Sequence, residues 1–218
     1  MTTFTLRHRA LVLLALCVSH SADAQPSKPN TQPATTRYLT ATLSGGCYWT
    51  METVFEHTRG VVDVVSGMTG GAAAPRSYQR NPTGTLGAAE SVRITYDPAK
   101  LSYADLLRVY FSAAHDPTQV DRQGPDVGAR YRSVVWVADD AQRSTALAYI
   151  ATLEQGAGKP KVATQVAPVA DFHPVIDSEQ DFAEKNPNHP YVAFWDRPRL
   201  EKYRNGLPDF FREREARR

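Results

Sequence analysis

Cys47 is the residue of this chain whose setting most clearly suggests chemistry. Two glycines, Gly45 and Gly46, precede it, and an aromatic pair, Tyr48 and Trp49, follows it. The glycines allow a tight turn, so the stretch is typical of a strand that ends where a helix begins. At a helix N-terminus, unpaired amide groups and the helix dipole stabilise a thiolate, and we therefore expect the pKa of Cys47 to be lowered. The alternative is a small buried residue that packs the helix against the core.

The first 24 residues have the pattern of a secretory signal peptide. Basic residues at 7–9 precede an apolar run at 10–18, and a small-x-small cleavage site follows at 22–24. The run is shorter than the about 20 residues that cross a bilayer, so we expect no stable membrane insertion. We expect a mature chain that begins at Gln25 and is periplasmic or secreted.

The cysteine count bears on the role of Cys47. The sequence has two cysteines, and removal of the signal peptide would take Cys17 with it. Exported proteins normally use cysteines in pairs, as disulfides. A single thiol in an oxidising compartment is a liability unless it is buried or performs chemistry. The count therefore adds weight to a working thiol at Cys47 and leaves the packing alternative open.

The rest of the sequence is predicted to form one domain. Residues 25–36 are rich in Pro, Thr, Ser and Asn and are predicted to be a disordered linker. Residues 37–218 are long enough to bury a sizeable core. The formal net charge of +2 gives no reason to expect nucleic acid or an acidic membrane as a partner. Residues 211–218 mix Arg and Glu and are predicted to be the solvated end of a helix.

Hydrophobic periodicity and turn residues predict the elements that position Cys47. Strands are predicted at 38–43, 61–68, 90–96, 133–138 and 161–169, and helices directly after Cys47 and at 102–114, 139–155 and 177–185. Long loops are predicted at 69–86 and 115–131, and such loops are often functional. Strands and helices do not alternate strictly, so we expect an α+β fold: a single-domain two-layer α/β sandwich with a ferredoxin-like core.

Four polar residues outside the Cys47 stretch are candidates for the same site. Glu90 opens a predicted strand, Asp126 follows Gly-Pro in a loop, and Tyr78 and Tyr131 lie in the two long loops. Each has an ordinary alternative: an exposed carboxylate at a strand start, an Asp that makes a turn, or a packing tyrosine with one polar end in water. Taken singly, these residues do not decide between the two interpretations.

The order of the motifs along the chain is more informative. Gly-Gly-Cys-Tyr-Trp-x-x-Glu at 45–52 resembles the Gly-Cys-Phe-Trp signature of the A type of peptide methionine sulfoxide reductases. The resemblance continues through Ser-Gly-Met-Thr-Gly-Gly at 66–71, Ala-Glu-Ser-Val-Arg-Ile at 89–94, Tyr-Asp-Pro at 96–98, His-Asp-Pro-Thr at 115–118 and the segment 123–133. It covers residues 37–187, and several dispersed motifs in the family's order make it specific.

The resemblance implies that Cys47 is the nucleophile that attacks the sulfoxide sulfur. Glu90 would hydrogen-bond the sulfoxide oxygen and supply a proton as this oxygen leaves. A carboxylic acid can do so at neutral pH only if burial keeps it protonated, as an aromatic-lined pocket favours. The product on the enzyme would be a cysteine sulfenic acid, which thiols reduce.

The resemblance also assigns the residues around the substrate. Tyr78 and Tyr131 would donate hydrogen bonds to the sulfoxide oxygen, and Asp126 would orient that network. Tyr48 and Trp49 would form the apolar wall that takes the substrate methyl group. The resemblance implies no cofactor, and the six histidines of the sequence show no spacing typical of metal ligands, so we expect no metal site.

The sequence departs from the family pattern at several positions. Tyr48 stands where the family usually has Phe, and Ala88, Val127 and Glu179 stand where it usually has His. We expect these replacements to affect the orientation of the catalytic groups and the rate. The resolving cysteines that the family commonly has near the C-terminus are also missing from the sequence. The resemblance therefore implies an external thiol reductant, either a thioredoxin-like protein or a small thiol.

The function that we expect is thiol-dependent reduction of methionine-S-sulfoxide, free or protein-bound, as repair of oxidised exported proteins. We expect a monomer with no nucleic-acid partner. Two alternatives stay open. A thiol peroxidase would use the same cysteine and acid, although peroxide needs no methyl pocket. A catalytically inactive module that binds methionine-rich segments would fit the missing histidines.

Overall fold

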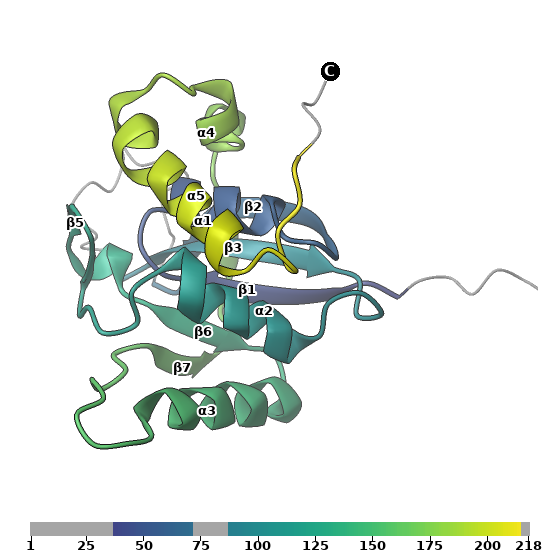
Figure 1. Ribbon diagram of the computed structural model, residues 1–218, viewed down its shortest axis with the longest axis vertical. Coiled ribbons are helices and arrows are strands. Elements are labelled where there is room, and N and C mark those ends of the chain that lie inside the picture. Colours follow the sequence, from purple (N-terminus) through teal and green to yellow (C-terminus); the bar gives the residue numbers. More distant parts are fainter. Residues whose placement is uncertain (1–36, 72–86, 215–218) are drawn as a thin grey trace, which may run out of the picture. The chain divides into compact units, whose positions relative to one another are not determined.

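The computed structural model describes residues 37–71 and 87–214. A six-stranded sheet with the order β7-β6-β1-β3-β2-β8 forms its centre (Figure 1). Neighbouring strands are antiparallel except β6 and β7, which are parallel. The strands are β1 Leu39–Ser44, β2 Val61–Thr69, β3 Ala89–Tyr96, β6 Val134–Val137, β7 Gln165–Pro168 and β8 Phe172–Pro174. The predicted signal peptide, the predicted linker and Tyr78 lie outside the described residues.

Helices cover the sheet and carry the site. They are α1 Tyr48–Glu56, α2 Tyr103–Val109, α3 Asp140–Glu154, α4 Phe182–Lys185 and α5 Arg197–Gly206. The π-helical turn η2 Tyr110–Ala114 continues α2, and a second one, η5 Val192–Asp196, leads into α5. α1 packs on β2 and β3, and α5 contacts both α1 and η2 (Figure 1). In the part of the chain that the structure describes, no helix has both the length and the apolar character needed to span a bilayer.

The first half of the domain has the ferredoxin-like topology that we expected. Elements β1, α1, β2, β3, α2 and β6 follow one another as β-α-β-β-α-β, and their strands lie in the order β6-β1-β3-β2. β3 is therefore inserted between β1 and β2 and pairs with both. β7 and β8 extend the two edges of this core sheet. The expectation of a single-domain α+β fold is confirmed.

Local sequence explains where the helices begin. The side chain of Ser102 accepts a hydrogen bond from the Asp105 backbone N–H at 3.1 Å at the start of α2. The side chain of Asp139 accepts one from the Gln142 backbone N–H at 2.8 Å at the start of α3. Both are ordinary N-caps. The N-cap position of α1 is occupied by Cys47, which makes no such bond.

The core that fixes α1 lies between the sheet and helices α1 and α2. It includes Leu43 of β1, Met51 and Phe55 of α1, Ile94 of β3 and Leu106 of α2, all fully buried. Burial of such side chains stabilises a fold by roughly 1.5–3 kcal/mol each. The same packing holds the first turn of α1, and so Cys47, at the ends of β1 and β3.

Three predicted elements differ in the structure. The predicted helix 177–185 is two short pieces, η4 Asp177–Glu179 and α4, because Asp181 between them adopts a left-handed conformation with φ 52°. The predicted strand 161–169 is shortened to β7. The predicted loop 115–131 contains a small hairpin, β4 Arg122–Gln123 with β5 Asp126–Val127, and the 3-10 turn η3 Ala129–Tyr131.

The prediction of a solvated helix end at 211–218 is wrong for residues 211–214, which pack on the domain. Phe211 is buried, forms a β-bridge with Thr58 and contacts the Tyr203 ring edge-on. Arg214 forms ion pairs with Glu56, Asp181 and Glu184. Burial of the Phe211 ring and the three ion pairs of Arg214 hold this segment on the domain. The mixed charges of the sequence did not indicate these contacts.

Candidate active site

Cys47 is buried at the junction of β1 and α1, with 9 % of its surface exposed. Gly46 before it has φ +98°, and a Cβ there would meet the Gln123 side chain at 2.5 Å, so the turn requires glycine. Burial raises the pKa of the Cys47 thiol well above its usual value, and the charges of Glu90 and nearby aspartates add to this effect. The Trp49 backbone N–H opposes it. The expected lowered pKa is therefore wrong for the resting protein, because desolvation outweighs the helix N-terminus.

Glu90, the expected proton donor, lies at the start of β3 and is buried. Its side chain is 1 % exposed, and one carboxylate oxygen accepts a hydrogen bond from the Tyr48 backbone N–H at 3.0 Å. The other oxygen forms an ion pair with Arg130, whose side chain is equally buried. Burial raises the pKa of Glu90 to about 7, although Arg130 and the Tyr48 N–H lower it. The expectation that burial favours the protonated acid is confirmed.

Cys47 opens onto an aromatic cavity of about 290 Å³. The cavity is lined by Cys47, Tyr48, Trp49, Asp126, Tyr131, His189 and Tyr191. All of the predicted site residues that the structure describes are in this lining except Glu90, which is buried and accepts a hydrogen bond from the Tyr48 backbone N–H. Tyr78 lies outside the described residues. The structure therefore brings together side chains from α1, β5, η3 and the segment before η5.

Tyr191 lines the cavity, although nothing in the sequence pointed to it. Its hydroxyl donates a hydrogen bond to the Asp126 carboxylate, and its ring meets Trp49 edge-on with 5.9 Å between centroids. Burial raises the pKa of Asp126, while this hydrogen bond and the charge of Arg130 lower it. Tyr191 lies in an aromatic run, Tyr-Val-Ala-Phe-Trp at 191–195, which the sequence analysis assigned to no element.

Arg130 is the second missed residue. It lies next to Tyr131 in η3, and it is among the largest fully buried side chains of the described residues. Besides the Glu90 ion pair, its guanidinium group lies over the Tyr131 ring, 5.3 Å from the centroid. A buried arginine cannot be recognised from sequence before its partner is known, because most arginines are exposed.

The two aromatic residues after Cys47 have different environments. The Tyr48 ring is buried, and its hydroxyl donates a hydrogen bond to the Glu179 carboxylate. The Trp49 ring is half-buried and stacks on Phe182 with 3.7 Å between centroids and 9° between planes. His189 approaches the Trp49 ring edge-on at 6.0 Å. Trp49 is thus held as a rigid wall of the cavity.

The three positions at which the resemblance predicts His lie in different environments. Val127 is 69 % exposed, and Ala88 is fully buried in the core. Glu179 is the acceptor for the Tyr48 hydroxyl. Of the three, only Glu179 contacts a residue of the cavity lining through an identified hydrogen bond.

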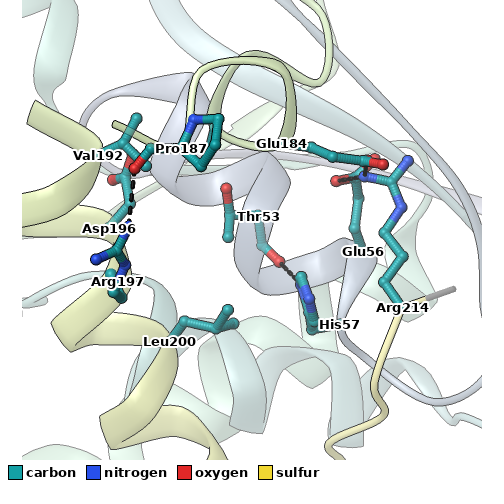
Figure 2. Close-up of a pocket in the computed structure, with 11 residues that line it drawn as sticks. Thr53, Glu56, His57, Glu184, Pro187, Val192, Asp196, Arg197, Leu200 and Arg214 are labelled. Atoms are coloured by element: carbon teal, nitrogen blue, oxygen red, sulfur yellow. Dashed lines mark hydrogen bonds and ion pairs between the residues drawn. The ribbon is translucent and has the colours of Figure 1, made fainter. Parts of the chain in front are cut away.

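A second cavity, also about 290 Å³, lies along the later turns of α1 (Figure 2). Thr53, Glu56 and His57 line it together with Asp196, and it contains no cysteine. Figure 2 shows Glu56 and Glu184 meeting Arg214 at one side. The carboxylates of Glu56, Asp181 and Glu184 are close enough together to hold a metal ion, but in the described structure Arg214 already provides their positive partner. This cavity therefore gives no sign of the chemistry at Cys47.

Most of the chain matches a known protein family. Residues 39–209 match the family model described as peptide methionine sulfoxide reductase. The match extends beyond 37–187 and includes Tyr191. The chain is 45 % identical over 170 residues to peptide methionine sulfoxide reductase MsrA 2 of Synechocystis sp., covering 78 % of this chain and 79 % of the relative. It is 42 % identical over 176 residues to MsrA 2 of Mesorhizobium japonicum, covering 80 % and 90 %.

Solved structures agree with this match. Reduced Mxr1 from Saccharomyces cerevisiae superposes with a TM-score of 0.65 at 28 % identity, over 72 % of this chain and 90 % of that one. Methionine sulfoxide reductase A of Corynebacterium diphtheriae superposes with a TM-score of 0.61 at 31 % identity, over 73 % and 78 %.

Proposed function

The chain belongs to the peptide methionine sulfoxide reductase family and reduces methionine sulfoxide, and on this premise we propose that Cys47 is its nucleophile. The observation that carries the proposal is the joint position of Cys47 and Glu90. The only cysteine beyond residue 17 lies beside a buried carboxyl group and opens onto an aromatic cavity. Burial, a perturbed pKa and a cavity are together typical of a catalytic site.

The proposed reaction moves one oxygen atom between two sulfur atoms. The Cys47 sulfur attacks the sulfoxide sulfur, and Glu90 passes a proton to the sulfoxide oxygen, which is a poor leaving group without it. The methionine sulfur is reduced by two electrons, and the Cys47 thiol is oxidised to a sulfenic acid. The proton that leaves the Cys47 thiol returns to Glu90, so the step needs no outside acid.

The oxygen is proposed to be held by hydroxyl groups in the cavity lining. Tyr131 donates a hydrogen bond to it, and Tyr78 is proposed to do the same from a segment outside the described residues. Asp126 is proposed to orient this network, and its carboxylate accepts a hydrogen bond from the Tyr191 hydroxyl in the same cavity lining. Preorganised donors of this kind stabilise the charge that develops on a leaving oxygen.

The aromatic wall is proposed to take the methyl group of the substrate. Trp49 is fixed by the Phe182 ring on one face, so its position does not depend on the substrate. Tyr48 contributes its ring edge, since its hydroxyl is bound to Glu179. The substrate is proposed to be the S epimer of methionine sulfoxide, both free and in oxidised proteins.

The reductant and the location complete the proposal. The sequence offers Cys17 and Cys47 alone, and Cys17 belongs to the proposed signal peptide at 1–24. An external thiol, from a thioredoxin-like protein or a small molecule, would attack the sulfenic sulfur. The domain at 37–218, joined by the linker at 25–36, would then repair oxidised proteins in the periplasm or outside the cell, as a monomer.

The test is a turnover assay on the mature chain with dithiothreitol as reductant. We expect reduction of the S epimer of methionine sulfoxide, little reduction of the R epimer, and no measurable turnover in Cys47→Ser, because a hydroxyl is a far weaker nucleophile. Activity in the serine variant would remove Cys47 from the mechanism. Faster turnover with hydrogen peroxide than with methionine sulfoxide would favour the thiol peroxidase alternative.

A further inference from the structure

The buried ion pair between Arg130 and Glu90 has no part in the proposed transfer of oxygen. Each of the two side chains is 1 % exposed. Taking two charges out of water costs free energy that their attraction does not always recover, so a buried pair is weak as a device for stability alone. The pair lies next to the start of α1, because the same Glu90 carboxylate accepts a hydrogen bond from the backbone N–H of Tyr48, the residue after Cys47.

Arg130 also contacts a second residue of the proposed machinery. Its guanidinium carbon lies 5.3 Å from the centroid of the Tyr131 ring, within the range of a cation–π interaction. The planar guanidinium group offers several N–H donors in a fixed geometry, so one side chain can hold a carboxylate and a ring at a set distance from each other.

Resting on the proposed function, we propose that Arg130 is a positioning residue that fixes the Glu90 carboxyl group and the Tyr131 ring around the sulfoxide oxygen and keeps Glu90 ready to accept the Cys47 proton. It touches neither the substrate nor the reacting sulfur in this scheme. It acts through Glu90 and Tyr131.

The groups around Glu90 decide whether its carboxyl group is protonated. Burial and the Asp126 carboxylate of β5 favour the protonated form of Glu90, and Arg130 of η3 and the Tyr48 N–H of α1 favour the carboxylate. Cys47 faces the same carboxylate, whose charge raises the pKa of the thiol. Without Arg130, Glu90 would keep its own proton up to a higher pH, and at neutral pH it could not take one from Cys47.

The consequence is a proton that circulates within the site. The Cys47 thiol gives its proton to the Glu90 carboxylate, the thiolate attacks the sulfoxide sulfur, and Glu90 passes the same proton to the oxygen. The reactive arrangement thus has one proton shared by two groups. At low pH the pair has two protons, and the thiol has no base beside it. The single-turnover rate therefore rises with pH through the apparent pKa of Glu90.

The experiment compares pH–rate profiles of single turnovers in wild type, Arg130→Gln, Arg130→Lys and a surface control, Lys100→Gln. Lys100 is 72 % exposed and its loss changes the net charge equally. We expect Arg130→Gln to move the rising limb of the pH–rate profile to higher pH by roughly 1–3 units. This is the usual effect of an opposite charge on the pKa of a carboxyl group. Arg130→Lys keeps the positive charge but loses the planar guanidinium group with its fixed N–H donors. The rising limb should therefore stay at the pH of wild type, while the plateau rate falls several-fold. Lys100→Gln should match wild type.

The position of the limb does not depend on how much of a variant is folded, so partial unfolding of Arg130→Gln does not obscure the result. An unmoved limb in Arg130→Gln would overturn the proposal. If that variant does not fold at all, a wild-type plateau in Arg130→Lys would overturn the positioning role. Failure of the proposed function itself is separate, because it would appear as turnover in Cys47→Ser.

Discussion

The Tyr48 hydroxyl donates a hydrogen bond to the Glu179 carboxylate, across 131 positions of sequence. The family resemblance predicts Phe and His at these two positions, and in the structure the two side chains that stand there meet. Because Tyr48 immediately follows Cys47, this contact ties the start of α1 to η4.

This relationship predicts that the two side chains are energetically coupled. Tyr48→Phe keeps the ring but removes the donor for a buried carboxylate, which should lower the free energy of unfolding by about 1–3 kcal/mol. Tyr48→Phe combined with Glu179→Leu should cost less than the sum of the two single changes. Urea denaturation of the four proteins in a double-mutant cycle measures the coupling. Strict additivity would show that the contact contributes nothing.

Glu90→Gln is predicted to slow sulfenic acid formation by roughly 10²–10⁴-fold, because the amide cannot transfer a proton in the transition state. The rising limb of the pH profile should also disappear with the titrating group. Rapid-quench single turnovers measure the step directly. A matched control is Glu201→Gln, an exposed carboxylate of α5. A wild-type rate in Glu90→Gln would remove this residue from the mechanism.

The pH dependence of the wild type follows from two raised pKa values. Glu90 has a pKa of about 7, and the pKa of Cys47 lies well above its usual value. Between these two values the pair holds one proton, the number that the reaction needs. The single-turnover rate should therefore rise as the pH is raised through about 7 and remain level into the alkaline range. A rate that falls between pH 6 and 8 would mean that both protons must be present.

Trp49→Ala is predicted to weaken substrate binding, with a rise in KM of roughly tenfold, because the methyl group loses its apolar wall. The plateau rate at saturating substrate should change much less. Phe194→Ala is the control, since this aromatic side chain is 75 % exposed and lies outside the cavity lining. Equal KM values in wild type and Trp49→Ala would place the methyl group elsewhere.

The sulfenic acid is predicted to persist when no reductant is present. If Cys17 leaves with the proposed signal peptide, the sequence retains no second thiol to attack it. After one equivalent of methionine sulfoxide, mass spectrometry should show a gain of one oxygen at Cys47 that dimedone can trap. A mature N-terminus upstream of Cys17, or recovery of unmodified thiol, would contradict this.

The sequence by itself determined the elements whose signals are local. The strand before Cys47, the helix after it and the helix starts at Ser102 and Asp139 depend on side chains a few residues apart, and they lie where the sequence predicted. The motifs from Cys47 to Tyr131 also identified the family, because their order along the chain is itself a linear property.

Only the tertiary structure decided which side chains reach the same place and what surrounds them. Arg130 and Tyr191 act on Glu90 and Asp126 through contacts that span 40 and 65 positions, and no local pattern encodes such pairs. The pKa of Cys47 was predicted with the wrong sign for the same reason. A helix N-terminus is visible in the sequence, but the burial that outweighs it arises only when β1, β3 and α1 pack together.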